Sequence, residues 1–466
     1  MQPDPECPSC AILSRQVAEL TELVKELQRT TEKQARENAR LRSRVNPTSR
    51  NSSTPPSQDP FRLRKSKSPS GRKQGGQPGH EGKGRELSPP DEVHSVKPCT
   101  CGKCGAPLSG DDPAPHRHQV WEIPPPKVIV TEHQLHALTC EGCGHTTRAE
   151  LPDGVSRSQF GPNVHATIAT STGRYNVSRR DTQQMLADSY GLDISLGSIS
   201  NIEHRVSQEL APAHAEALEE VQAAGVKHAD ETTWRQKGQA GYMWAAATLT
   251  AAAFLIRPSR GSEVAKELLT EAPTGVTVTD RYSGYSFIPM EQRQVCWSHL
   301  DRDFEKMAEG EKELHQIGMS LLALTDEMFE RWHTFREGKI ERGELARNCT
   351  GIRLKMFALL DRGAKSRGHR TPSLCRGILK TEPCMWVFVD VPGVEPTNNY
   401  GERSIRRAVK LRKSCFGSQS ERGSRFVERM QTVSATLALR KQNLFEFLRR
   451  AADSSLGSGD APSLRS

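Results

Sequence analysis

Three acidic residues, widely spaced along the chain, place the strongest constraint on its fold. Asp230 lies in GVKHADETTW and Asp280 lies in GVTVTDRYSGY, and each follows a short apolar or β-branched run that predicts a strand. An acid at the end of a buried strand is costly unless it is paired or bound to a metal ion. Single acids at strand–loop boundaries are common, so the argument depends on a third carboxylate.

The third acid, Glu402, lies in a segment that predicts a helix rich in positive charge. Residues 396–418 read PTNNYGERSIRRAVKLRKSCFGS, and the Thr-Asn-Asn at 397–399 is typical of a helix start, because these side chains accept hydrogen bonds from free backbone N–H groups. The basic residues of this helix are Arg403, Arg406, Arg407, Lys410, Arg412 and Lys413. Either Glu402 pairs with Arg406 on a solvated surface, or it is a metal-binding carboxylate on a helix that grips phosphates.

Two aspartates that follow strands and a glutamate on a helix form a pattern more specific than any one acid. Three carboxylates supply the hard oxygen ligands that Mg²⁺ or Mn²⁺ prefers. Two such ions can activate an attacking oxygen and stabilise the leaving one in phosphodiester chemistry. The net charge of +9 favours a polyanionic partner.

Four longer segments resemble, in this order, the transposases of the insertion-sequence-66 (IS66) family. They are HADETTW, VTDRYSGY, CWSHLDRDF and TNNYGERSIRRAVKLRKSCFGSQSERG, while NSSTPPSQDP and GGQPGHEGK extend the resemblance to nearly the whole chain. The resemblance implies a bacterial DDE transposase with an RNase H-like core. It implies Asp230, Asp280 and Glu402 as the catalytic acids.

The same resemblance bears on residues beside the acids. Tyr400 and Gly401 stand before the glutamate, where the family more often has small residues such as alanine, and this departure leaves the carboxylates intact. His299 and Asp301 lie in the Cys-Trp-x-His element. We expect them either to shape the site or to serve as capping and core residues.

The expected activity is that of a DNA transposase of a bacterial insertion sequence. It would nick the element ends in a metal-dependent reaction, and the resulting 3′-OH would attack target DNA. One alternative is a non-catalytic DNA-binding protein, such as a decayed transposase or a regulator, which the intact triad argues against. Another is an RNase H-like nuclease without strand transfer. Accessory proteins encoded by the same element are further candidate partners.

The fold class expected is a multidomain α/β protein with an RNase H-like mixed sheet. The catalytic domain is predicted over residues 222–450, and its strands over residues 225–230, 242–249, 252–256 and 276–280. The charged, helical stretch at about 304–380 is too long for a simple connection, so it predicts an inserted helical subdomain. Residues 451–466 are Ser- and Gly-rich and predict a disordered tail.

The N-terminal part predicts a coiled coil followed by a linker. Over residues 11–46, apolar side chains alternate at spacings of four and three, and Asn38 would fix the register of a two-stranded coil. The apolar series begins with Leu13, Val17, Leu20, Val24 and Leu27. A helix packed on its own domain is the alternative, but residues 47–92 are polar, basic and predicted to be flexible, which favours a homo-oligomer.

Residues 93–155 predict a zinc-ribbon-like module with a structural Zn²⁺. Cys101 and Cys104 form one CxxC pair and Cys140 and Cys143 the other, and each pair is followed by glycine. Four thiolates leave no open position for chemistry. The remaining nearby candidates are Cys99 as a substitute ligand, and His116, His118 and His145 as surface residues. The lone pair Cys7 and Cys10 is interpreted as free thiols.

Residues 160–215 predict a helix-turn-helix-like DNA-binding region with a central glycine, Gly191. Ser195, Ser198 and Asn201 would lie near the front of its second helix, where base contacts are made. A plain helical packing module is the alternative.

The sequence contains no run of about 18 apolar residues, so no membrane-spanning helix is expected. Its first residues lack the basic-then-apolar pattern of a signal peptide. The expectation is a bacterial cytoplasmic, nucleoid-associated protein whose cysteines are thiols or metal ligands.

Overall fold

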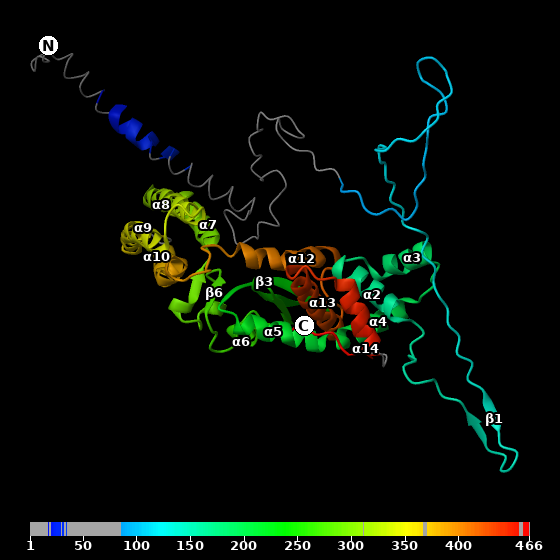
Figure 1. Ribbon diagram of the computed structural model, residues 1–466. Helices are drawn as coiled ribbons and strands as arrows, with labels where there is room; N and C mark the ends of the chain where they lie inside the picture. The colour runs from blue at the N-terminus through cyan, green and yellow to red at the C-terminus, as the bar shows by residue number, and fades with distance from the viewer. Residues whose placement is uncertain are drawn as a thin grey trace, which may run out of the picture. The chain divides into compact units, whose positions relative to one another are not determined.

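The computed structural model describes residues 17, 20–28, 30–31, 34, 85–310, 312–366, 371–455 and 460–465 (Figure 1). The chain divides into two compact units, Met1–Pro126 and Lys127–Ser466, and each is described by itself. No helix among the described residues is long and apolar enough to cross a membrane.

The first unit contains the predicted N-terminal helix and an irregular segment. Residues 20–28 are helical, and the side chains of Val17, Leu20, Val24 and Leu27 are at least half exposed. Asn38, Cys7, Cys10 and most of the basic linker lie outside the described residues. Between residues 85 and 126 the backbone forms little regular structure apart from an isolated antiparallel bridge between Thr100 and Pro107.

The second unit begins with a small hairpin and a group of helices. The hairpin pairs β1 (Ala137–Thr139) with β2 (Thr146–Arg148). The helices that follow are α2 (Pro162–Ala169), η3 (Thr170–Arg174), α3 (Arg179–Tyr190), α4 (Leu196–Glu209) and α5 (Ala211–Ala223). Gly191 ends α3 in the left-handed conformation, at φ 64°, as its place in the predicted turn requires.

A five-stranded mixed sheet follows, in the order β5-β4-β3-β6-β7. Its strands are β3 (Val226–Gln236), β4 (Gln239–Ala247), β5 (Ala252–Arg257), β6 (Val276–Thr279) and β7 (Arg293–Val295). β3, β4 and β5 pair antiparallel, whereas β3, β6 and β7 pair parallel. Four of these strands were predicted close to their observed positions, but β7 was not predicted, and β3 runs on to Gln236, six residues beyond Asp230.

Helices cover both faces of this sheet, and the alternation of residues along β4 shows how. Trp244 and Ala246 lie in a core formed with α5 and α6 (Ser262–Leu269). Met243 and Ala245 lie in the opposite core, which is completed by α12 (Asn399–Cys415) and α13 (Glu421–Leu439). Both faces of β4 are therefore buried over its second half, which explains why residues 243–247 are apolar without interruption.

The helical stretch between β7 and α12, which includes the insertion predicted at about 304–380, begins with α7. Its elements are α7 (Trp297–Ala308), α8 (Lys312–Arg336), α9 (Arg342–Ala364), α10 (Thr371–Leu379), η6 (Pro383–Met385) and α11 (Val387–Asp390). Trp297, Trp386 and Phe388 pack edge to face or stacked in its core. Val276 and Val278 of β6 belong to the same apolar cluster, so the insertion is packed directly on the sheet.

The helices before the sheet share a core with the helices after it. Ile199 and Val206 of α4 are buried with Met430 of α13 and Leu448 of α14 (Leu444–Ser455). In Figure 1, α2 and α4 lie beside α13 and α14. The segments predicted as separate domains, 160–215 and 222–450, therefore contribute to one continuous core.

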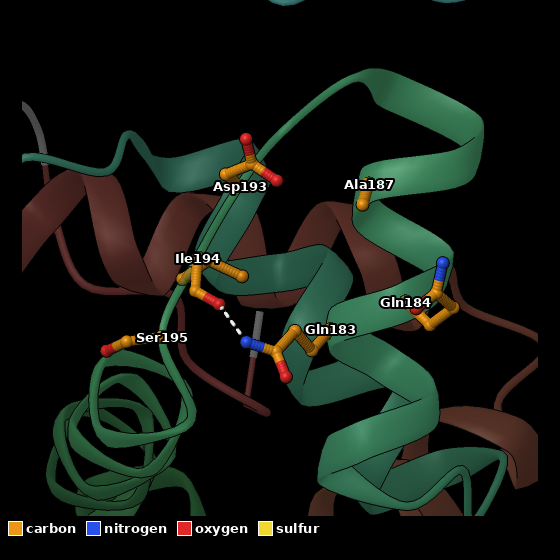
Figure 2. Close-up of a pocket in the computed structure, with 6 residues that line it drawn as sticks. All are labelled: Gln183, Gln184, Ala187, Asp193, Ile194 and Ser195. Atoms are coloured by element: carbon orange, nitrogen blue, oxygen red, sulfur yellow. Dashed lines mark hydrogen bonds between the residues drawn. The ribbon is translucent and has the colours of Figure 1, made fainter.

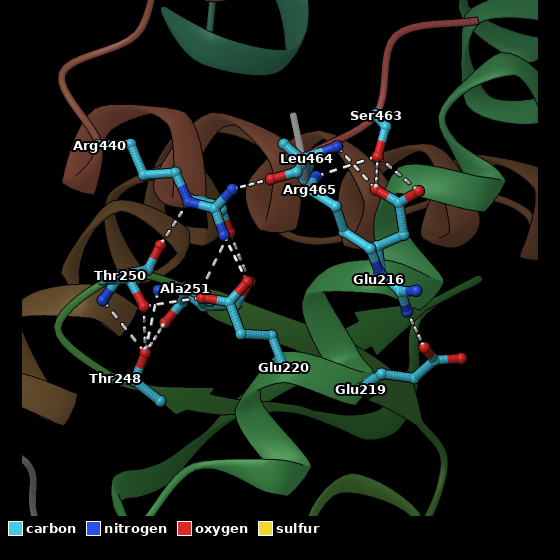
Figure 3. A network of polar contacts seen from close by, with 12 residues as sticks. Glu216, Glu219, Glu220, Thr248, Thr250, Ala251, Arg440, Ser463, Leu464 and Arg465 are labelled. Atoms are coloured by element: carbon cyan, nitrogen blue, oxygen red, sulfur yellow. Dashed lines mark hydrogen bonds and ion pairs between the residues drawn. The ribbon is translucent and has the colours of Figure 1, made fainter.

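The C-terminal segment makes ordered contacts, which differs from the predicted tail. α14 is helical to Ser455, and the side chain of Leu464 is buried. Ser463 donates a 2.9 Å hydrogen bond to Glu216 of α5, and the Leu464 N–H donates to the same carboxylate at 2.7 Å (Figure 3). Arg440 bonds both the Leu464 carbonyl and Glu220, so residues 463–465 are held against α5.

The described fold is mixed α/β, as the sequence predicted.

Candidate functional site

Asp230 and Asp280 each lie two residues past the last pair of the parallel ladder between β3 and β6. In the ladder between β3 and β6, Val226 pairs with Val276 and His228 pairs with Val278. Continuing this register by two residues brings Asp230 opposite Asp280. Asp230 therefore lies where the parallel pairing ends, although β3 itself continues in its antiparallel pairing with β4.

The alternation of side chains along β3 separates Asp230 from its acidic neighbour. Asp230 lies on the same face of β3 as Trp234, which packs in the core formed with α12. Glu231 lies on the opposite face, and its nearly buried carboxylate accepts hydrogen bonds from Arg260 at 2.6 Å and from the Tyr285 hydroxyl at 2.7 Å. Glu231 is therefore a paired acid on the far face of the sheet, while Asp230 faces the helix that carries Glu402.

Contacts along its length hold α12 against β3. At its start, the Asn398 side chain donates a 2.8 Å hydrogen bond to the Ala229 carbonyl. In its last turn, the Arg412 guanidinium donates to the Thr232 hydroxyl at 2.8 Å and to the Thr233 carbonyl at 3.1 Å. Past its end, the Ser418 N–H donates to the Arg235 carbonyl at 2.8 Å. Together these contacts set the position of Glu402 relative to Asp230.

Asn398 has a different role from the helix cap that the sequence predicts. It is the first residue before α12, yet its side chain makes no capping hydrogen bond. Its Oδ1 lies 3.1 Å from Nδ1 of His228, and its backbone N–H donates to the Cys296 sulfur at 3.1 Å. A Cβ at Gly401 would come within 2.7 Å of the Asn398 Oδ1, which accounts for glycine at that position.

Glu402 turns toward α7, where His299 and Arg302 are its neighbours. Its Oε1 lies 3.7 Å from Nδ1 of His299 and 4.0 Å from Nη2 of Arg302. Backbone hydrogen bonds connect the start of α7 to the end of β6 and to the segment before α12. The Cys296 N–H donates to the Thr279 carbonyl at 2.8 Å, and the Trp297 N–H donates to the Pro396 carbonyl at 2.9 Å. The i,i+4 pair between Glu402 and Arg406 is replaced by these contacts with another helix.

The carboxylates influence one another electrostatically. Burial raises the pKa of Asp230 well above its ordinary value, and the negative charges of Glu231, Asp280 and Glu402 raise it further. Burial also raises the pKa of Glu402, which nearby Asp280 raises further and Arg302 lowers. Like charges gathered in this way disfavour ionisation unless a cation is added.

The donor atoms at this site fit a divalent cation. Carboxylates from β3, the end of β6 and α12 supply oxygen ligands. The Oε1 atom of Glu402 and the Nδ1 atom of His299 are buried without a hydrogen-bond partner. Burial lowers the pKa of His299 to about 4, which keeps its imidazole neutral near pH 7 and able to act as a ligand.

Cys296, His299 and Glu402 also form a group with metal-ligand spacing, because their donor atoms lie within 4.8 Å of one another. Sequence reasoning placed His299 near the site but gave no role to Cys296 or Arg302. The Cys-x-x-His spacing on one helical turn is the signal that could have identified Cys296, whereas Arg302 has no such signal. Asp301 is half-buried on the same helix.

Most basic side chains of α12 are exposed to solvent. Exposed residues on this helix are Arg403, Arg406, Arg407, Lys410 and Lys413. Arg412 differs, because its hydrogen bonds to β3 hold it half-buried and burial lowers its pKa. Ile405 packs on the sheet, as predicted.

Residues of α3 and of the turn before α4 line a pocket of about 380 Å³ (Figure 2). Gln183 of α3 donates a 2.6 Å hydrogen bond to the Ile194 carbonyl in the turn. Ser195 caps α4 by accepting a 3.0 Å hydrogen bond from the Ser198 N–H, and the two hydroxyls are 2.9 Å apart. Asn201 is exposed on the first turns of α4.

Each CxxC pair lies at the tip of a tight turn within its own unit. The Gly105 N–H donates to the Cys101 carbonyl at 2.9 Å, and Gly105 has φ 74°. The Gly144 N–H donates to the Cys140 carbonyl at 2.8 Å, and Gly144 has φ 73°. Hydrogen bonds from neighbouring backbone groups lower the pKa of the Cys101 and Cys140 thiols. Such turns present thiolates to a metal ion.

Comparison with known protein families is consistent with these observations. Residues 157–426, more than half of the chain, match the transposase IS66 family. Residues 98–144 match the zinc-finger binding domain of transposase IS66, which supports a structural zinc in this segment, and residues 4–86 match a family of unknown function (DUF6444). No curated protein matches the chain. The chain belongs to the IS66 family of transposases.

Proposed function

We propose that this protein is a DDE transposase that cleaves DNA at the ends of its element and joins them to target DNA. The observation that carries the proposal is the convergence of three carboxylates. Asp230 and Asp280 each lie two residues past the last pair of the ladder between β3 and β6, and Glu402 comes from the helix that Asn398 bonds to β3. The raised pKa of Asp230, caused in part by the other two acids, supports their closeness.

In this proposal Asp230, Asp280 and Glu402 hold Mg²⁺ or Mn²⁺. When bound, such ions activate an attacking oxygen and stabilise the leaving oxygen in phosphodiester chemistry. Asn398 fixes the approach of α12 to β3 and thereby orients Glu402. Arg406 would reach the scissile phosphate, while Arg403, Arg407, Lys410 and Lys413 would contact flanking phosphates, which position DNA without reading its sequence.

The architecture supports an RNase H-like catalytic core. Three antiparallel strands followed by two parallel ones place an acid on the central strand and another after its parallel neighbour. Helices α8 to α10 would form the insertion between the second and third acids. The pair α3 and α4 would read DNA through Ser195, Ser198 and Asn201, and the N-terminal helix would form a coiled coil between copies.

The remaining parts are assigned from sequence and family. Cys101, Cys104, Cys140 and Cys143 would hold one structural zinc, consistent with the zinc-finger match over residues 98–144. The DNA partners would be the element ends and the target, with accessory proteins of the same element as further partners. Such substrates place the protein at the bacterial nucleoid.

The test is a nicking and joining assay with labelled element ends. Asp230→Asn, Asp280→Asn and Glu402→Gln should each lower Mg²⁺-dependent cleavage by several orders of magnitude while DNA binding persists, because metal ions supply several kcal/mol of transition-state stabilisation. Glu231→Gln is the matched control, since Glu231 lies beside Asp230 on the opposite face and should retain cleavage. Near-normal nicking by any triad variant would overturn the assignment.

Two outcomes for the unmodified protein would favour the alternatives. Binding of element ends without any metal-dependent cleavage would indicate a DNA-binding protein that has lost activity. Cleavage without joined products would indicate a nuclease. Joined products that depend on all three acids would exclude both.

A further inference from the structure

His299 and Glu402 face each other across α7 and α12 with their donor atoms unsatisfied. His299 Nδ1 lies 3.7 Å from Glu402 Oε1, and both atoms are buried without a hydrogen-bond partner among the described residues. Leaving two buried polar atoms unpaired costs free energy. A bound ion between the two atoms would give both of them a partner.

The separation suits two ligands of one metal ion. A hydrogen bond would bring the two atoms to about 2.7–3.2 Å, so 3.7 Å is too long for a good one. Ligand atoms that are each about 2.1 Å from an ion lie roughly 3.0–3.7 Å apart when the angle between them is about 90–120°. One ion between Nδ1 and Oε1 would satisfy both atoms.

The backbone places His299 beside the other acids as well. His299 is in the first turn of α7, and the residue before this helix, Cys296, is bonded through its N–H to the carbonyl of Thr279. Thr279 immediately precedes Asp280. His299 is thus held between the end of β6 and the start of α12.

Cys296 has a different role in this cluster. Its sulfur accepts the backbone N–H of Asn398 at 3.1 Å, and its side chain is fully buried. The thiol is therefore used in joining the start of α7 to the start of α12. This leaves His299 and Glu402 as the two donors with free coordination capacity.

We propose that His299 Nδ1 is a nitrogen ligand of the divalent ion held by Glu402. The inference rests on the proposed function and deepens it, because it assigns the class of metal. Carboxylate oxygens alone suit Mg²⁺, whereas imidazole shifts the preference toward first-row transition metals. The site should therefore bind Mn²⁺ more tightly than an all-carboxylate site would.

The experiment is pulsed electron paramagnetic resonance of Mn²⁺ bound to the tag-free, full-length protein. An imidazole ligand gives ¹⁴N modulation of the Mn²⁺ echo, which carboxylates do not. We expect this modulation in the unmodified protein and its loss in His299→Phe, with Mn²⁺ affinity at least about tenfold weaker. His333→Phe, at an exposed histidine of α8, is the matched control and should leave both unchanged.

A second variant tests whether the effects of His299→Phe on Mn²⁺ come from the aromatic ring that the substitution introduces. In His299→Asn, the amide oxygen takes nearly the place of Nδ1, so Mn²⁺ should bind more tightly than in His299→Phe but without ¹⁴N modulation. Modulation that persists in both variants, or its absence from the unmodified protein, would overturn the inference.

The result also separates this inference from the proposed function. Mn²⁺ binding that depends on Asp230, Asp280 and Glu402 but shows no nitrogen would reject only the role of His299. Mn²⁺ binding that is indifferent to all three acids would reject the proposed metal site itself.

Discussion

The Asn398 side chain donates a 2.8 Å hydrogen bond to the carbonyl of Ala229, the residue before Asp230. Glu402 lies one helical turn after Asn398, and its N–H donates to the Asn398 carbonyl at 3.0 Å. One asparagine thus connects the strand that carries the first acid to the helix that carries the third. The relative position of two proposed metal ligands depends on this residue.

Asn398→Ala should weaken both folding and catalysis. The substitution leaves the buried Ala229 carbonyl without this donor and removes the contact with His228, at a cost of roughly 1–3 kcal/mol in the free energy of unfolding. Cleavage should fall more than DNA binding does. Urea unfolding and a nicking assay would measure the two effects, with exposed Asn399→Ala as control. Equal losses for both variants would show that Asn398 has no special role.

The sequence predicted β3 to β6 because local patterns encode them. Apolar runs before Asp230 and Asp280 were sufficient to place β3 and β6. The extension of β3 to Gln236 was missed because its last residues are mostly polar. Their pairing with β4 comes from the hairpin turn rather than from composition.

The sequence patterns did not predict contacts between segments that are distant in the chain. Arg412 looks like every other base on α12, yet it alone is bonded to Thr232 and Thr233. The pairing of Glu402 with His299 joins residues over a hundred positions apart in the chain. Such contacts depend on how helices dock on the sheet, which residue spacing within one helix does not determine.

The raised pKa of Asp230 predicts a pH dependence of stability. The folded protein retains this proton to a higher pH than the unfolded chain, whose aspartates titrate near 4. Between these two pKa values the folded state binds more protons, so the stability contributed by this group falls as pH rises. Without added divalent ions, Asp230→Asn should therefore raise the free energy of unfolding at pH 8, and the gain should shrink toward pH 4.

Urea unfolding of both proteins across this pH range would measure the gain. Added Mg²⁺ should reverse the order at pH 8, because ligand binding stabilises only the protein that retains the site. A gain that is independent of pH would contradict the electrostatic explanation.

Two basic residues of α12 have different expected roles, one in DNA contact and the other in the stability of the fold. Lys410 is exposed, so Lys410→Ala should weaken binding to all DNA sequences alike and lower the log–log salt slope by about one unit. Arg412→Ala should instead lower the melting temperature, because it removes hydrogen bonds to β3. Fluorescence anisotropy over a salt series, with thermal unfolding, would test both. An unchanged slope in Lys410→Ala would indicate that this face does not bind DNA.

Arg406→Ala should affect the reaction more than the complex. Arg406 is one turn after Glu402 and exposed, so it is placed to approach the reacting phosphate. We expect cleavage to fall by a larger factor than DNA affinity. Binding and nicking measured on the same preparation would decide, and parallel losses would assign Arg406 to general phosphate contact.

The zinc prediction concerns metal content as well as folding. The full chain should carry about one Zn²⁺, measured by elemental analysis, and Cys101→Ser or Cys140→Ser should lose it because metal affinity contributes directly to folding here. Cys99→Ser is the control. Cys99 lies outside the proposed set of four ligands and is the candidate to replace one of them, so this variant should retain the zinc. Retained zinc in Cys101→Ser together with loss in Cys99→Ser would reassign the ligand set.

The exposed apolar stripe of the N-terminal helix predicts self-association. Val17, Leu20, Val24 and Leu27 are at least half exposed. Burying an apolar side chain of this kind is worth about 1.5–3 kcal/mol. Pairing two such stripes in a coiled coil would bury them at spacings of four and three. Changing both Leu20 and Leu27 to Asp should therefore shift the full-length protein toward the monomer in sedimentation analysis.

Lys25 provides the control for this change. It lies on the same helix outside the stripe and pairs with Glu22 at 2.7 Å, a surface ion pair of little energetic weight. Lys25→Asp alters the charge of the helix without touching the apolar seam, so the oligomeric state should persist. If the double leucine variant and Lys25→Asp sediment alike, the stripe does not mediate association. If the double variant alone dissociates, the helix joins copies of the chain through its leucine face.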